Sequence, residues 1–126
     1  MHENQLATII VDCAFKVHKT LGPGLLESVY QAALAYELTK RELNISVERG
    51  IPANYEDIQL ELGFRADIIV ENKVIIEVKS IQALAPIHGK VLLTYLRLAD
   101  MRLGILINFN VSLIKDGIQR VVNNLR

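Results

Sequence analysis

The sequence has only one cysteine, Cys13, so no disulfide can form within the chain. A reduced, cytoplasmic setting is therefore expected. No apolar run approaches the length needed to cross a membrane, and the first residues, Met-His-Glu-Asn-Gln, do not resemble a signal peptide. Repeats, low-complexity segments and linkers are also missing from the sequence. We therefore expect a single domain without a membrane partner.

Neither sign of charge is in excess. Lys plus Arg and Asp plus Glu both number 14, so the formal net charge is zero. A protein that coats DNA non-specifically is basic, so any contact with nucleic acid here must come from a local patch. The length of 126 residues, with 51% hydrophobic and 22% charged residues, is typical of a soluble globular domain with one core.

Residues 64–80, FRADIIVENKVIIEVKS, form the most informative stretch. The pattern predicts two strands, 66–70 and 74–78, joined by a tight turn at 71–73. Both strands contain three consecutive apolar residues, which indicates that both faces are covered and that the hairpin is central. Within it lie Asp67, Glu77 and Lys79, although charges are seldom buried without a partner or a metal. These three residues are the first candidates for function.

The length of the turn decides which face Asp67 occupies. Glu77 and Lys79 share a face by their spacing alone. A three-residue loop pairs Val70 with Val74 and therefore sets Asp67 opposite Glu77, whereas a two-residue turn sends Asp67 to the other face. We expect the three-residue loop, or a bulge with the same effect.

Two carboxylates directly across a ladder repel each other, and a divalent cation such as Mg²⁺ or Mn²⁺ would remove that repulsion. Lys79 could direct its ammonium at a phosphoryl oxygen or at an attacking water. Such a set can perform metal-assisted hydrolysis of a phosphodiester. The alternative is an ion-pair lattice in which Arg65 and Lys79 neutralise Asp67 and Glu77. On spacing alone, the lattice ranks slightly ahead.

The N-terminal half is predicted to be helical. A helix over residues 3–19 ends before Gly22-Pro23-Gly24, and its polar side is expected to leave His18 in solvent. A second helix follows over residues 25–41. Glu27 lies in its first turn, where it either complements the helix dipole or delivers a third carboxylate to the metal, and position alone favours the dipole role. The apolar side of this helix is expected to comprise Leu26, Val29, Tyr30, Ala33 and Tyr36.

The remaining pattern completes an α/β order. Strands are predicted over residues 46–53 and 57–62, before the central hairpin. A helix then begins at Pro86 and ends near residue 99, with His88, Val91 and Tyr95 together on one side. A buried strand over 102–109 and a short terminal element at 118–122 follow. Hairpins followed by a helical crossover imply a mixed sheet flanked by helices.

Gly24, Glu27 and Tyr30 resemble the motif that names the small prokaryotic GxxExxY proteins, a family of the PD-(D/E)xK nuclease superfamily. The likeness extends over nearly the whole chain and in the right order. It includes residues 65–67 (RAD), 77–79 (EVK), 93–96 (LTYL), 108–110 (NFN) and 115–118 (KDGI).

The resemblance implies a single nuclease-like domain over residues 1–126, with a restriction-endonuclease-like αβββαβ core. It implies hydrolysis of nucleic acid, DNA more than RNA, at a site that uses Mg²⁺ or Mn²⁺. Asp67 and Glu77 would bind the metal, Lys79 would be the catalytic lysine, and Glu27 would be the carboxylate that a helix adds. Residues expected to contact the substrate are Tyr30, Arg65, His88 and Tyr95.

Two positions depart from the pattern of these relatives. Ala66 replaces the proline of the superfamily's name, which leaves the metal-binding acid in place. Val91 stands where relatives carry a glutamine, four residues before Tyr95, and valine cannot hydrogen-bond to a substrate. The rival interpretation is therefore a catalytically impaired protein of this fold that binds nucleic acid or a protein partner. A homodimer that uses the apolar side chains of Val11 and Phe15 is a third.

Overall fold

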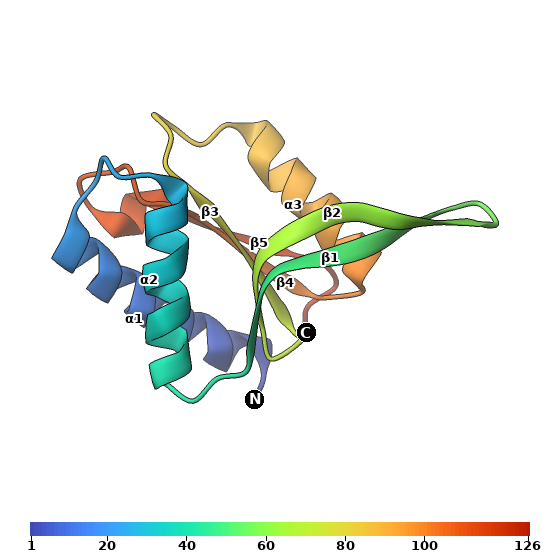
Figure 1. Ribbon diagram of the computed structural model, residues 1–126, viewed down its shortest axis with the longest axis horizontal. Coiled ribbons are helices and arrows are strands. Elements are labelled where there is room, and N and C mark those ends of the chain that lie inside the picture. Colours follow the sequence, from blue (N-terminus) through green and yellow to red (C-terminus); the bar gives the residue numbers. More distant parts are fainter.

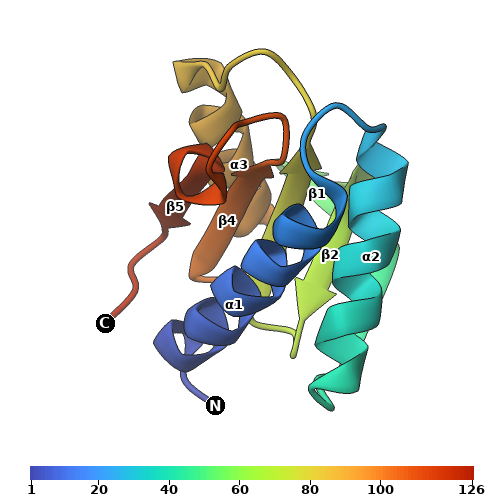
Figure 2. The same cartoon turned by 90° about the vertical axis from the view of Figure 1, so that its left-hand side faces the viewer.

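The computed structural model describes all 126 residues. Its elements are α1 (Glu3–Leu21), α2 (Glu27–Lys40), β1 (Ile45–Tyr55), β2 (Ile58–Val70), β3 (Val74–Lys79), α3 (Pro86–Ala99), β4 (Leu103–Asn108), a 3₁₀ turn (Ile114–Gly117) and β5 (Ile118–Val122). Figures 1 and 2 show α1 and α2 on one face of the sheet and α3 on the other. The predicted fold class, a mixed sheet flanked by helices in the order αβββαβ, is confirmed.

The five strands lie in the order in which they occur along the chain. All neighbours are antiparallel except β3 and β4, which are parallel and are joined through α3. A parallel pair needs such a crossover because a tight turn can join only antiparallel strands. The predicted register of the central hairpin is also confirmed, since Val70 pairs with Val74 and Ile68 with Ile76.

The sheet separates two hydrophobic clusters. The larger one packs α1 and α2 against the sheet, and the smaller one packs α3 against its other face. Strand β3 contributes to both, with Ile76 in the larger cluster and Ile75 in the smaller one. Every residue of β4 is buried, because β4 is an interior strand with helices on both faces.

The buried face of α2 differs from the prediction. Leu26, Val29 and Tyr36, expected to be apolar contacts, are exposed. The buried residues are Tyr30, Leu34 and Leu38. Alanines and large apolar residues occur all round this helix, so its sequence does not single out one stripe. Packing against α1 and the sheet buries the side on which Tyr30, Leu34 and Leu38 follow one another at intervals of four residues.

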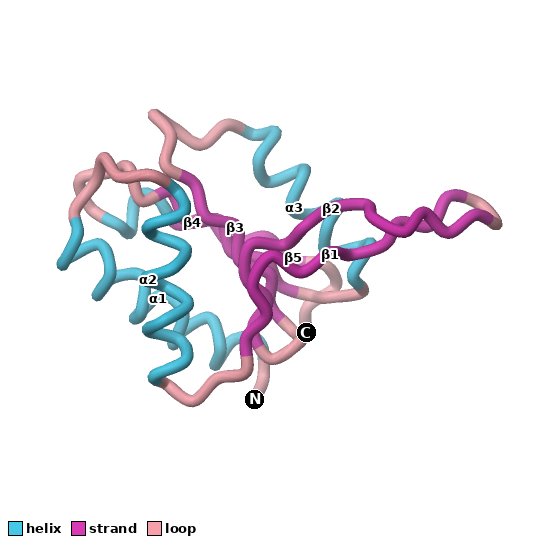
Figure 3. Tube along the Cα trace, in the orientation of Figure 1, coloured by secondary structure: helices cyan, strands magenta, loops and turns pink.

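Strand β2 also differs from the prediction, because residues 58–70 form one strand where two were expected. Gly63 does not break the strand. A Cβ at this position would lie 2.7 Å from the Cβ of Ala53 on β1, so the glycine permits close approach of the two strands. The outer halves of β1 and β2 form a two-stranded arm that projects from the body (Figures 1 and 3).

Tyr30 lies in the core, so the expectation that it contacts a substrate is wrong. Its side chain is fully buried and its ring stacks on Phe109, with 4.6 Å between the ring centroids. The hydroxyl donates to the carbonyl oxygen of Gly22 at 2.5 Å and accepts from the backbone N–H of Leu25 at 3.1 Å. Tyr30 therefore fixes the loop between α1 and α2, in which Gly24 has a φ of 100° that suits glycine.

Replacing Tyr30 with Phe should destabilise the protein while leaving the fold intact. The variant keeps the stacked ring but leaves two main-chain groups without their partner, which costs about 1–3 kcal/mol. Chemical denaturation of the wild type and the variant measures this loss. The matched control is Tyr36→Phe, because the side chain of Tyr36 is exposed and its hydroxyl makes no hydrogen bond within the protein. Equal stability of the Tyr30→Phe variant and the wild type would contradict this role.

Candidate active site

Asp67 and Glu77 face each other where the ladder between β2 and β3 ends. The last regular pair is Ile68 with Ile76. Beyond it, the backbone N–H of Asp67 donates to Oε2 of Glu77 at 2.9 Å, and the backbone N–H of Val78 donates to Oδ2 of Asp67 at 2.8 Å. Each carboxylate thus accepts from the opposite strand in place of a backbone carbonyl. The sequence prediction that these two acids lie together is consistent with this geometry.

Strand β2 changes face at Asp67. With strict alternation, Ala66 and Ile68 would lie on the same face. Instead, Ala66 packs in the cluster beneath α3, and Ile68 packs in the cluster beneath α1 and α2. Asp67 therefore lies at the point where the arm separates from the flat part of the sheet.

Glu48 lies across from this point on β1. It falls between the pairs Val47 with Ile68 and Arg49 with Ala66, and its φ is 54°. Such a left-handed conformation costs a non-glycine residue about 1–2 kcal/mol. The side chain turns to α2, where Oε1 accepts a hydrogen bond from Nε2 of Gln31 at 2.8 Å. Sequence reasoning missed Glu48, because a single glutamate in an edge strand carries no signal of its own.

Burial and like charge act together on the two central acids. Glu77 is only 8% exposed, and burial, together with the charge of Asp67, raises its pKa to about 8. Burial also raises the pKa of Asp67, against the hydrogen bond from Val78, and the charges of Glu48 and Glu27 raise it further. At neutral pH, Glu77 therefore keeps a proton that a bound cation would displace.

No basic side chain forms a salt bridge with either acid of the pair. The molecule has two salt bridges, Lys16 with Glu37 and a contact between Arg41 and Asp12, and neither includes Asp67 or Glu77. The ion-pair contacts of the lattice considered from spacing are therefore not formed, although the charge of Lys79 lowers the pKa of both acids. The side chain of Arg65 is exposed, and it makes no ion pair with either acid.

A small pocket opens beside Glu77, between β3, β4 and α3. Its volume is about 110 Å³, and its polar lining consists of Glu77, Lys79, His88 and Tyr95. Nδ1 of His88 accepts the backbone N–H of Ala85 at 2.8 Å, so the proton of the neutral ring is on Nε2. The site thus combines two acids with groups that can donate hydrogen bonds.

Tyr95 and Val91 complete the wall of the pocket that α3 supplies. The ring of Tyr95 stacks on Phe64 of the arm, with 3.9 Å between the centroids. Burial raises the pKa of Tyr95, and the charges of Glu77 and Asp67 add to this effect, so its hydroxyl stays protonated. Val91 presents only methyl groups to the pocket.

Asn108 fixes the end of β3 that carries Lys79. Lys79 pairs with Asn108 of β4, and its carbonyl oxygen accepts the backbone N–H of Phe109 at 2.9 Å. The buried amide of Asn108 accepts the N–H of Ile81 at 3.1 Å and donates to the carbonyl of Ile81 at 3.0 Å. Asn108 is the only polar residue of β4 and lies at its end. This pattern is the sequence signal that could have identified its structural role.

The structure brings together Asp67, Glu77 and Lys79, but not every predicted residue. No three side chains among His, Cys, Asp and Glu lie close enough together to hold a metal ion. Glu27 is exposed in the first turn of α2 and acts on Asp67 through its charge.

The residues present nonetheless fit a divalent cation. Mg²⁺ is commonly bound through one or two carboxylates and keeps several of its waters. Asp67 and Glu77 supply two hard oxygen donors, and each uses one oxygen for a backbone N–H of the opposite strand. The repulsion between their charged forms is what a metal would relieve.

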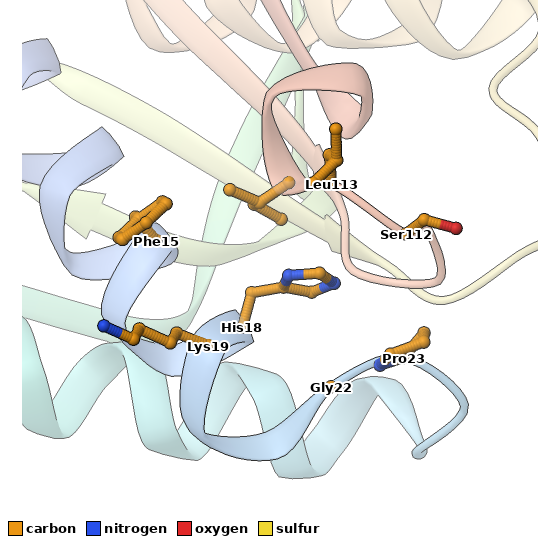
Figure 4. Close-up of a pocket in the computed structure, with 8 residues that line it drawn as sticks. Phe15, His18, Lys19, Gly22, Pro23, Ser112 and Leu113 are labelled. Carbon is orange, nitrogen blue, oxygen red and sulfur yellow. The ribbon is translucent and has the colours of Figure 1, made fainter.

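A second pocket lies away from these residues. It has a volume of about 370 Å³ and lies between the end of α1 and the segment that carries Ser112 and Leu113 (Figure 4). His18, predicted to be in solvent, is buried at its edge, and its Nε2 lies 2.7 Å from the carbonyl oxygen of Val111. The correction follows from this long-range hydrogen bond, which a helical pattern does not reveal.

The mixed sheet and the acid pair with its lysine define a restriction-endonuclease-like α+β domain. The family model described as the PD-(D/E)XK nuclease superfamily matches residues 4–121, which include Asp67, Glu77 and Lys79. The chain therefore belongs to the PD-(D/E)XK nuclease superfamily.

Among solved structures, "Crystal structure of SSO0001" superposes with a TM-score of 0.57 at 23% sequence identity. The match covers 79% of this chain and 50% of that chain, so this protein spans half the length of that one, and the likeness shows the fold. No curated protein matches the sequence. None of the helices combines the length and the apolar character needed to span a bilayer.

The raised pKa of Glu77 predicts that metal-free protein loses stability as the pH rises. Between the ordinary pKa of a glutamate and about 8, the folded state binds a proton that the unfolded state has released. The free energy of unfolding therefore falls from about pH 5 to about pH 8 and then levels off. Denaturation across this range should show the fall in the wild type with a chelator present. Glu77→Gln should flatten the curve, and an identical slope in this variant would contradict the assignment.

Proposed function

We propose that this protein is a metal-dependent nuclease that hydrolyses phosphodiester bonds of nucleic acid, with DNA as the preferred substrate and Mg²⁺ or Mn²⁺ as the cofactor. The observation that carries the proposal is the pair Asp67 and Glu77. These acids lie together, mostly buried and without a salt bridge, in a chain that belongs to a nuclease superfamily. A structural role alone gives no reason to place two carboxyl groups side by side where burial and like charge oppose their ionisation.

Each residue has a distinct task in this proposal. Asp67 and Glu77 would hold the cation, which when bound supplies a Lewis acid and lowers the pKa of a water. The ammonium of Lys79 stabilises negative charge that develops on the phosphoryl oxygens. His88 can donate from Nε2, and Tyr95 from its hydroxyl, to an oxygen of the substrate. Arg65, exposed on β2, can contact the phosphate backbone.

We also propose that the chain belongs to the GxxExxY branch. The support is local: the three residues of the motif act on one loop and one helix end. Gly24 supplies the positive φ of the loop, and Tyr30 closes the loop through its hydroxyl. Glu27 then opens α2 with its carboxylate free and within electrostatic range of Asp67. We propose the cytoplasm as the location of this protein.

A second candidate function is supported by Val91. Its apolar side chain lines the pocket beside Tyr95, where no other residue supplies an amide. A protein with this wall could bind nucleic acid or a protein partner without turnover.

Val11 and Phe15 are exposed on α1, as the homodimer interpretation requires.

The nuclease proposal is tested by cleavage of plasmid and single-stranded DNA with and without Mg²⁺ or Mn²⁺. We expect cleavage by the wild type that a chelator abolishes. Lys79→Ala should reduce the rate about 100-fold or more while the melting temperature holds, as happens when one group that stabilises transition-state charge is removed. The matched control is Lys115→Ala, because Lys115 is exposed in the 3₁₀ turn outside the pocket.

The same assay separates the two candidate functions. An inactive wild type that becomes active as Val91→Gln would support the impaired interpretation, because the amide restores hydrogen bonding to the pocket. A wild type that cleaves, with Lys115→Ala unchanged and Lys79→Ala inactive, would support the nuclease. Cleavage that persists in Lys79→Ala would contradict the site proposed here.

A further inference from the structure

Glu48 is the only non-glycine residue with a positive φ inside a strand. Six others share such a conformation, and all of them lie in turns or loops: Glu42, Glu56, Glu71, Asn72, Asp100 and Asn124. In a turn, a positive φ serves to reverse the chain. Within β1 no reversal is needed, so the conformation of Glu48 serves something else.

The positive φ of Glu48 sets the direction of its side chain. Glu48 sits on β1 at the level where Asp67 sits on β2, since the pairs on both sides of them keep the same register. The flipped backbone delivers the carboxylate to Gln31 of α2, at 2.8 Å. Gln31 lies one helical turn after Glu27, on the same side of α2. The exposed carboxylate of Glu48 is thus held against α2, on the strand next to the one that carries Asp67.

The strand pairing also favours Glu48 over Glu27 as a neighbour of the pair. Glu48 lies on β1, the strand next to Asp67, whereas Glu27 lies on a helix that covers the sheet. No lysine or arginine forms a salt bridge with Glu48, so its charge is available to a cation.

We propose that Glu48 is the third carboxylate of the site, with Gln31 as the residue that positions it. This inference rests on the proposed metal-dependent function. Because no three acids lie close enough to hold one ion directly, Glu48 acts through waters that the ion retains. Glu27, the acid that the sequence motif singles out, then has the smaller effect on the cation.

The experiment is calorimetric titration of Mn²⁺ into the wild type and four variants. Glu48→Gln keeps an acceptor oxygen for Gln31 and removes the charge, and it should weaken Mn²⁺ binding about 10-fold, the lower range for partners outside the ligand shell. Glu48→Gly removes the side chain and tolerates the positive φ, so it should fold and bind equally weakly. Glu27→Gln should weaken binding less than Glu48→Gln.

The matched control is Glu56→Gln. Glu56 is also a glutamate with a φ of 54°, but it lies exposed at the tip of the arm, so its variant should bind Mn²⁺ like the wild type. A thermal melt without metal checks that each variant is folded.

The outcomes separate this inference from the proposed function. Binding that is weakened in both Glu48 variants, with their metal-free melts preserved, supports the inference. If the wild type binds Mn²⁺ and Glu48→Gln binds it as tightly as Glu56→Gln does, the role of Glu48 is overturned and the nuclease proposal stands. A larger loss in Glu27→Gln than in Glu48→Gln would also overturn it. A folded wild type that binds no Mn²⁺ overturns both.

Discussion

The structure depends on two carboxyl groups that lie together, mostly buried, where two strands separate. Asp67 and Glu77 each accept a backbone N–H from the opposite strand, which replaces the ladder where β2 and β3 separate. These hydrogen bonds favour the charged forms, while burial and mutual repulsion oppose them, and the raised pKa of Glu77 shows which effect is larger. The pair is therefore poised to bind a divalent ion.

The rest of the fold keeps this pair in place and open on one side. The parallel pairing of β3 with β4 buries the strand that carries Glu77, and Asn108 holds the segment after Lys79. Helix α3 closes one wall of the pocket with His88 and Tyr95. The change of face at Asp67 lifts the arm away from the sheet, so that acids from α2 and β1 act on the same point.

The sequence predicted the fold and the central pair because their signals are local. Two apolar runs and an odd turn set the register, and the crossover helix begins at its proline. The buried side of α2 could not be predicted, since apolar residues surround that helix and only packing chooses among them. The position of Glu48 depends on a single unusual φ, and the burial of Tyr30 depends on a loop carbonyl. Neither leaves a pattern in the sequence.

The central claim is that Asp67 and Glu77 form a cation site, and an anomalous difference map from crystals soaked in Mn²⁺ tests it most directly. The account predicts a strong peak within bonding distance of a carboxylate oxygen of both residues, lost in crystals of Glu77→Ala. A map with no peak near the pair at saturating Mn²⁺, or with a peak that persists unchanged in Glu77→Ala, would contradict it.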